Sequence, residues 1–126
     1  IGSRYVPGGS IPEWPWYRRA LSIWGNRYAA ALLGFAVRDA TSGYRAYTAD
    51  VIRQINMQTI KADGCGFQIE MAYRVCLVGG TIEEIPINFT DRTLGQSKMS
   101  SRIVVEALYL VTRWAARDRL LGRRRR

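Results

Sequence analysis

Apolar and polar residues follow two periodicities along this chain, one typical of helices and one typical of strands, and together they predict helices alternating with strands. Ile85, Ile87 and Phe89 alternate with polar neighbours as in a strand, and Pro86 predicts an edge position or a bulge there. Thr48 is placed to cap a short helix. The expected elements are a strand end at residues 1–4, a loop at 6–16, a helix at 17–34, a strand at 44–47, a helix at 49–56, a helix at 67–78, a strand at 81–89 and an amphipathic helix at 100–121. Such alternation favours an α/β layered fold with functional loops at the strand ends.

The apolar residues of the two middle helices fall on defined sides. In the 17–34 helix, Leu21, Trp24 and Tyr28 recur at helical spacing, together with Ala31 and Leu32. In the 67–78 helix, the apolar side is formed by Ile69, Tyr73, Cys76 and Leu77.

Composition narrows the class of protein. A chain of 126 residues has room for one domain with a real core. Its net charge of +9 indicates an anionic partner: nucleic acid, a membrane surface or a phosphorylated substrate. The absence of histidine excludes Ser-His and Cys-His nucleophilic catalysis and every histidine-based metal site.

Cys65 and Cys76 lack metal-site spacing, and we interpret both as reduced packing residues. Charged residues interrupt every apolar stretch, so no transmembrane segment is expected, and no signal peptide is visible. The opening residues resemble the end of a buried strand. We therefore expect the chain to be the back part of a longer polypeptide.

A candidate phosphate-binding loop follows the predicted 81–89 strand. Arg92, Gly95, Ser97 and Lys98 combine forked N–H donors, a compact charge, a hydroxyl and a flexible backbone. An ordinary solvated loop on a basic chain explains the spacing equally well.

The segment DATSGYRAY, residues 39–47, is a second candidate because a carboxylate, hydroxyls and an arginine meet on one turn. The competing interpretation is a turn that satisfies its own backbone, with Arg45 paired to Asp39. From the residues alone, we favour the second interpretation.

Trp14, Trp16 and Tyr17 beside Arg18 and Arg19 are typical of a membrane interface, where aromatic rings lie at headgroup depth. The alternative is that these aromatic rings face the core. The basic run 123–126 is compatible with a solvated tail or with an anionic leaflet. A nucleic-acid partner is not expected, because the basic residues are scattered and form no recognisable nucleic-acid module.

Five ordered motifs resemble one family. They are GSRY with its following GG; Trp16, Arg18 and Ser22; DATSGYRAY; GFQIEM; and GGTIEEIPINFTDRTLGQSKM. Together they are similar to the dolichol- or polyprenol-phosphate mannosyltransferases, which are family-2 glycosyltransferases with the GT-A (Rossmann-like) fold. The resemblance extends to Trp114.

The resemblance implies an inverting transfer of mannose from GDP-mannose to a polyprenyl monophosphate, with Mg²⁺ or Mn²⁺ held by an Asp-x-Asp motif. This chain has no such motif. Residues 1–126 would therefore be the C-terminal, acceptor-side part of the catalytic domain, inactive alone, with the nucleotide-binding half preceding Ile1. A peripheral enzyme on the cytoplasmic face of the membrane is expected, and a fused or partner membrane protein is compatible with this expectation.

The resemblance also assigns residues. Asp39 matches an acidic position near the sugar, where acting as a base, orienting the sugar and pairing an arginine all remain open. Residues 5–16 would form a mobile acceptor loop, and Trp14 and Trp16 the membrane interface. The residues implied for phosphate and acceptor binding are Arg4, Arg18, Ser22, Arg92, Ser97 and Lys98. Transfer of glucose or another sugar, and a non-catalytic module that binds anionic membranes, are the alternatives.

Overall fold

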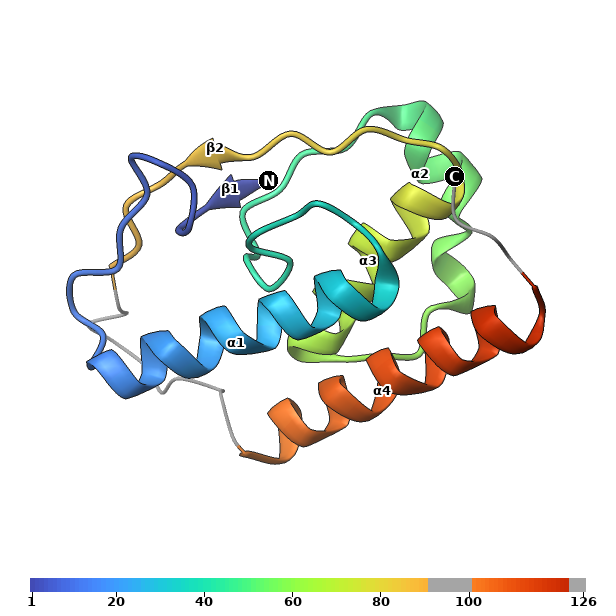
Figure 1. The fold of residues 1–126 in the computed structure, drawn as a ribbon. Helices are drawn as coiled ribbons and strands as arrows, with labels where there is room; N and C mark the ends of the chain where they lie inside the picture. The colour runs from blue at the N-terminus through green and yellow to red at the C-terminus, as the bar shows by residue number, and fades with distance from the viewer. Residues whose placement is uncertain (91–100, 123–126) are drawn as a thin grey trace.

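The computed structural model describes residues 1–90 and 101–122. Helices dominate it, and the strands are short (Figure 1). The elements in chain order are β1 (Gly2–Ser3), α1 (Trp16–Leu33), α2 (Ala49–Ile55), the 3-10 turn η1 (Met57–Thr59), α3 (Gly64–Leu77), β2 (Ile85–Pro86) and α4 (Ser101–Leu120). The expected α/β class is confirmed for these residues, but three α-helices and no strand lie between β1 and β2, so strand and helix do not alternate as predicted. The GT-A assignment remains a prediction.

β1 and β2 form a parallel two-stranded sheet in which Gly2 pairs with Ile85 and Ser3 with Pro86. Ile85 N donates to Ile1 O at 2.9 Å, and Ile87 N donates to Ser3 O at 3.0 Å. The position of Pro86 falls between these two donors, where the ladder to β1 requires no N–H. An edge position for Pro86 agrees with this pairing.

Local sequence explains where the helices start and stop. Pro15 precedes α1, and Gly34 ends it in the left-handed conformation at φ 70°. The Thr48 hydroxyl accepts from Val51 N at 3.4 Å, which confirms the predicted cap of α2. None of the described helices combines the length and the apolar character needed to span a bilayer.

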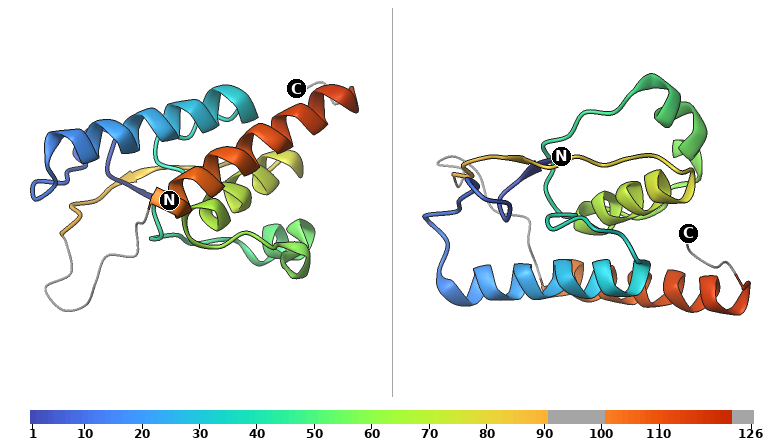
Figure 2. Two further views of the ribbon diagram at one scale, coloured as in Figure 1. Left: turned by 90° about the horizontal axis from the view of Figure 1, so that it is seen from below. Right: turned by 45° about the horizontal axis from the view of Figure 1, so that its top comes forward.

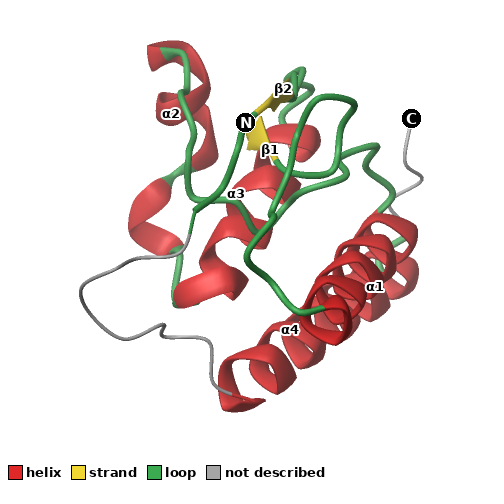
Figure 3. Ribbon diagram, turned by 90° about the vertical axis from the view of Figure 1, so that its left-hand side faces the viewer, coloured by secondary structure: helices red, strands yellow, loops and turns green. Residues whose placement is uncertain are grey.

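The core is organised around α3. Figure 3 shows α3 lying between α2 on one side and the neighbouring helices α1 and α4 on the other. The two views in Figure 2 show the second half of α1 (cyan) lying beside the first part of α4 (orange), with the other ends of the two helices extending past each other. One cluster joins α1, α3 and α4 through residues that include Leu33, Ile69, Tyr73 and Val111. A second joins α2 and α3 through Ile55, Met71 and Val75. Each such side chain contributes about 1.5–3 kcal/mol on burial.

Two expectations about the elements were wrong. Residues 44–47 form no strand, because Gly2 N to Tyr44 O, at 2.7 Å, is the single backbone bond recorded between this segment and β1. The 81–89 strand is reduced to β2 and a bridge between Asn88 and Ser10. The apolar stripe of α1 coincides only in part with its buried side: Tyr28 and Leu32 pack against the core, whereas Leu21 and Trp24 are about half exposed. The buried residues of α1 are Asn26, Ala29 and Leu33.

The apolar side predicted for α3 was correct only in part. Ile69 and Tyr73 are buried, whereas Cys76 and Leu77 are exposed because α3 turns its other side toward α2. Both cysteines are free, but only the half-buried Cys65 packs against the main cluster. Burial raises the pKa of the Cys65 thiol, which keeps it protonated at neutral pH.

Candidate functional site

A buried ion pair joins the end of β1 to the loop that follows α1. Arg4 Nε and Nη2 donate to the two carboxylate oxygens of Asp39, each at 2.8 Å, and Arg4 backbone N donates to Oδ2 at 2.9 Å. Only 7% of Arg4 and none of Asp39 is exposed. A forked pair of this kind fixes the plane of the guanidinium as well as its position.

Aromatic rings surround the Arg4 guanidinium. Its central carbon lies 5.2 Å from the ring centre of Tyr5, 5.1 Å from that of Trp14 and 5.4 Å from that of Phe89. Burial alone would lower the pKa of Arg4, but the hydrogen bonds and the charge of Asp39 outweigh burial and raise that pKa. Arg4 therefore stays a cation in a poorly hydrated setting, where Asp39 is its counter-ion.

Gly9 lies so close to the backbone of Ser3 and Arg4 that no larger residue fits at this position. A Cβ at this position would lie 2.6 Å from Ser3 O and 2.8 Å from Arg4 O. The loop after β1 therefore folds directly against the backbone that carries Arg4. This close approach accounts for the second glycine of the GG pair that follows GSRY.

Helix α1 contributes the other side of the site. Tyr5 Oη donates to Ser22 Oγ at 2.6 Å. Burial raises the pKa of Tyr5 although its bond to Ser22 opposes the shift, so the phenol stays neutral and remains a donor. The Arg18 guanidinium lies 4.0 Å from the Trp14 ring centre, so Trp14 contacts both Arg4 and Arg18. The predicted residues Arg4, Arg18, Ser22 and Asp39 are thus connected through direct contacts and shared neighbours.

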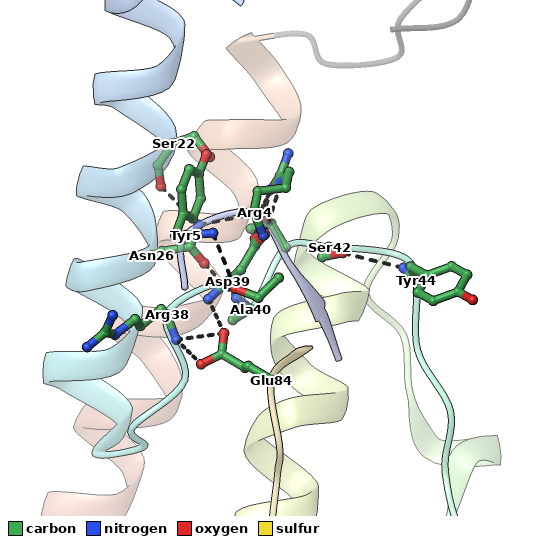
Figure 4. A network of polar contacts seen from close by, with 12 residues as sticks. Arg4, Tyr5, Ser22, Asn26, Arg38, Asp39, Ala40, Ser42, Tyr44 and Glu84 are labelled. Carbon is green, nitrogen blue, oxygen red and sulfur yellow. Dashed lines mark hydrogen bonds and ion pairs between the residues drawn. The ribbon is translucent and has the colours of Figure 1, made fainter. Parts of the chain in front are cut away.

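Asn26 joins α1 to the Asp39 loop, as Figure 4 shows. Its amide nitrogen donates to Ser22 O at 3.0 Å, and its amide oxygen accepts from Ala40 N at 2.7 Å. The same nitrogen approaches Thr41 Oγ1 at 3.4 Å, and Arg4 Nη2 donates to that hydroxyl at 3.0 Å. Sequence reasoning missed Asn26, because at helical spacing it lies on the side of the helix opposite the apolar stripe of Leu21 and Trp24, and only the fold shows that this side is buried.

The local pairing of Arg45 with Asp39 was wrong. Arg45 donates instead to three carbonyl oxygens: Ser42 O at 2.7 Å, Gln68 O at 2.8 Å and Ala40 O at 2.5 Å. Arg45 therefore holds the turn together, which leaves Asp39 to pair with Arg4. The interpretation of this segment as a turn that satisfies its own backbone was therefore correct in part: Arg45 bonds to the turn carbonyls of Ala40 and Ser42, but Asp39 pairs with Arg4 outside the turn.

Glu84, just before β2, was also missed. Its two carboxylate oxygens accept from the backbone N–H groups of Arg38 and Asp39 at 2.8–3.1 Å (Figure 4). A carboxylate thus fixes the backbone at Asp39 from the side opposite Arg4. In the sequence, Glu84 is one of two consecutive glutamates inside the predicted 81–89 strand, and nothing there distinguishes it from Glu83.

The remaining predicted residues divide into two groups. Arg92, Ser97 and Lys98 lie outside the described residues. Trp14 is only 9% exposed and packs edge-on against Phe89, so its prediction as a membrane-interface residue does not fit its position. Its ring instead contacts the guanidinium groups of Arg4 and Arg18. Trp16, by contrast, is 80% exposed.

The described residues offer no cluster of acidic or cysteine side chains that could hold a metal ion. Asp39 does not fit such a role because Arg4 occupies both of its oxygens. The arrangement instead provides the fixed N–H donors of Arg4 and the positive charge of the half-buried Arg18, which are the groups that bind a phosphate.

Comparison with known proteins agrees with this chemistry. An undecaprenyl-phosphate mannosyltransferase from Micrococcus luteus is 47% identical over 126 residues, covering 100% of this chain and 52% of the relative. A polyprenol monophosphomannose synthase from Mycolicibacterium smegmatis is 45% identical over 120 residues, covering 95% of this chain and 45% of the relative. The chain is homologous to the polyprenol-phosphate mannosyltransferases. This confirms the family that the motifs resemble.

The chain spans about half the length of these two polyprenol-phosphate mannosyltransferases. No family model and no solved structure matches it. The homology covers Arg4, Arg18, Ser22 and Asp39, because the first alignment spans the whole chain.

Proposed function

We propose that the full-length protein transfers mannose from GDP-mannose to a polyprenyl monophosphate, and that this chain supplies the acceptor side. The observation that carries the proposal is the buried Arg4–Asp39 pair beside Arg18 and Ser22, in a chain homologous to enzymes named for this transfer. Four residues that the motifs assigned to phosphate binding or catalysis meet at this place. Arg92, Ser97 and Lys98 remain proposed phosphate ligands.

The residues suit a reaction in which the acceptor phosphate is the nucleophile. A phosphate monoester is already anionic near neutral pH, so it needs little help from a base. Its oxygen attacks the anomeric carbon of mannose, the bond to the GDP oxygen breaks, and direct displacement inverts the configuration to give a β-mannosyl phosphate. The main demand on the protein is to hold two anionic groups together, and the buried Arg4 and the half-buried Arg18 would meet it.

Asp39 acts in this proposal by orienting Arg4 and not as a base. Both of its oxygens already accept hydrogen bonds from the Arg4 guanidinium, and none of the residue is exposed. A base must reach the proton that it removes. Of the roles left open by the sequence, pairing an arginine is the one that this geometry supports.

We place the nucleotide-binding half and the ligands of Mg²⁺ or Mn²⁺ outside this chain, in the remainder of the full-length protein. The metal would neutralise charge on the donor diphosphate. The described residues would then contribute Arg4 and Arg18 on the acceptor side.

Sugar transfer by the full-length protein tests the proposal. The protein is incubated with polyprenyl monophosphate, Mg²⁺ or Mn²⁺, and either GDP-mannose or UDP-glucose. The lipid product is then identified by its mass in a mass spectrometer. We expect a mannosyl product only. A glucosyl product would preserve the acceptor site but replace the donor, and no product from either would contradict the proposed activity.

We further propose that the protein is peripheral, on the cytoplasmic face of the membrane, and that α1 contacts the lipid. The exposed fractions of its large apolar residues are 80% for Trp16, 63% for Tyr17, 49% for Leu21 and 52% for Trp24. Such residues favour a headgroup region, and the exposed Arg19 and Arg27 add attraction to anionic lipid.

This second proposal is tested by flotation with vesicles of zwitterionic and anionic lipid. Replacing Trp16 and Trp24 together by Ser is expected to weaken binding at least about tenfold, since each ring buries a large apolar surface. Tyr44→Ser is the control, because Tyr44 is 69% exposed but lies off α1. Equal binding by both variants would contradict α1 as the contact surface.

A further inference from the structure

The backbone on either side of Arg38 converges on the carboxylate of Glu84. Arg38 N donates to Oε1 at 3.1 Å and to Oε2 at 3.0 Å, and Asp39 N donates to Oε1 at 2.8 Å. Consecutive N–H groups that point to one place form a natural anion site, and here the protein fills that site with its own side chain. Glu84 therefore fixes the peptide groups from which Asp39 projects.

The bonds of Asp39 carry this constraint to Arg4. Its carboxylate accepts from three nitrogens of Arg4, including the backbone N at 2.9 Å. Figure 4 shows Glu84 and Arg4 on opposite sides of Asp39. Because Asp39 has no exposed surface, the pair cannot adjust by moving toward solvent.

The pairing of β1 with β2 connects Glu84 back to the strand that precedes Arg4. Glu84 directly precedes Ile85, which pairs with Gly2 two residues before Arg4. The path from Arg4 to Asp39, to Glu84 and through β2 to β1 thus returns to its starting point. Because these contacts form a closed loop, a shift of Glu84 is expected to displace Asp39 and Arg4 as well.

One part of Arg4 is left for a ligand. Nε and Nη2 are committed to Asp39 and Thr41, whereas no hydrogen bond from Nη1 is found among the described residues. The direction of Nη1 is set by the plane of the guanidinium, and Asp39 sets that plane. A small error in the Asp39 loop would therefore misdirect the free donor.

We infer that Glu84 is a positioning residue for the acceptor phosphate, acting on Arg4 through the backbone of residues 38–39 and the Asp39 carboxylate. The inference rests on the proposed function for its ligand, but the link from Glu84 to Arg4 stands on the geometry alone. Glu84 itself does not contact the phosphate.

The test compares Glu84→Gln with Glu83→Gln in the full-length protein. Gln at 84 keeps one acceptor oxygen but turns an NH₂ group toward a backbone N–H that Glu84 satisfies. Glu83 carries the same charge next to it, is exposed, and has no side-chain hydrogen bond recorded within the described part of the chain. The measurements are kcat and KM for polyprenyl phosphate, the melting temperature, and exchange of the Arg4 Nε–H signal in ¹⁵N NMR spectra.

We expect Glu84→Gln to lower kcat/KM about 10- to 100-fold, as a small misplacement of a charged group does, at a melting temperature close to that of Glu83→Gln. The Arg4 Nε–H should exchange at least about tenfold faster, since its bond to Asp39 loosens. Glu83→Gln should match the wild-type protein in both measurements.

Three results would overturn the inference. One is that the two variants behave alike; another is that Glu84→Gln loses activity while the Arg4 signal is unchanged. The third is that neither Glu84→Gln nor the charge-preserving Glu84→Asp folds, which would make Glu84 purely structural. If the wild-type protein makes no glycolipid, the proposed function fails. In that case the exchange of the Arg4 Nε–H in the two variants still tests whether Glu84 positions Arg4.

Discussion

Two Arg–Asp pairs in this molecule have nearly the same length and very different surroundings. Arg4 and Asp39 meet at 2.8 Å with 7% and 0% of their side chains exposed, whereas Arg53 and Asp50 meet at 2.9 Å with 73% and 82% exposed. Water screens the second pair, and the first lies among aromatic rings. Distance alone therefore says little about what an ion pair does.

Burial makes the Arg4–Asp39 pair costly, because both charges lose their hydration on folding. A pair of this kind is weak evidence for stability and better evidence for a charge that must be held in one direction. The Arg53–Asp50 pair spans one turn of α2 and needs no partner from elsewhere in the fold. The Arg4–Asp39 pair, by contrast, joins residues that are 35 positions apart in the sequence.

The largest effect is expected from Asp39→Asn. The amide would present donors to the Arg4 guanidinium and leave its charge buried without a counter-ion. We expect a loss of about 3–5 kcal/mol in the free energy of unfolding, measured by urea denaturation of the full-length protein. A loss below about 1 kcal/mol would remove the distinction between the two pairs.

Gly9→Ala comes next. The new Cβ would meet main-chain atoms of Ser3 and Arg4, which cannot move as a flexible side chain does. We expect a loss of about 1–3 kcal/mol of unfolding free energy, from the same urea curves. Gly25→Ala is the control: no atom lies within 4 Å of its Cβ, and alanine favours a helix, so stability should hold or rise. Equal effects would show that the loop after β1 is not packed as described.

Asn26→Ala removes the amide between α1 and the Asp39 loop. The buried Ala40 N–H would lose its acceptor, at an expected cost of about 1–2 kcal/mol by thermal or urea unfolding. Asn88→Ala, whose amide contacts Ser10 at the surface, should change stability by less than about 0.5 kcal/mol. If the two variants lose the same amount, Asn26 has no special role in joining these elements.

The smallest effect is expected from Asp50→Asn. This removes an exposed partner of Arg53 and an acidic residue from the first turn of α2, together worth at most about 1 kcal/mol. The loss should shrink further in 0.5 M salt, unlike the loss at Asp39. A salt-independent loss as large as that of Asp39→Asn would contradict the comparison.

The sequence predicted the helices better than their orientation. Helical spacing located α1 and α4, and Thr48 marked the start of α2. Leu21 and Trp24 showed the same periodicity as a core stripe yet are half exposed, because a single sequence cannot tell a core face from a face reserved for another partner.

The site was predictable as a set of residues but not as a network. Arg4 and Asp39 were both singled out, by family motifs, yet local spacing suggested Arg45 as the partner of Asp39. The Arg4–Asp39 and Glu84–Asp39 contacts join residues 35 and 45 positions apart, which no periodicity reveals. Glu83 and Glu84 look alike in the sequence, and only the fold distinguishes them.

The most direct test of the central claim removes one positive charge at two consecutive positions of α1. Arg18 is half buried against Trp14, and Arg19 is exposed. If this chain forms a phosphate site, Arg18→Gln raises KM for polyprenyl phosphate or lowers kcat at least about tenfold, as expected for a charge-assisted contact, while Arg19→Gln changes either by less than about threefold. Equal losses in the two variants, tracking vesicle binding, would contradict the account and leave only a module that binds anionic membranes.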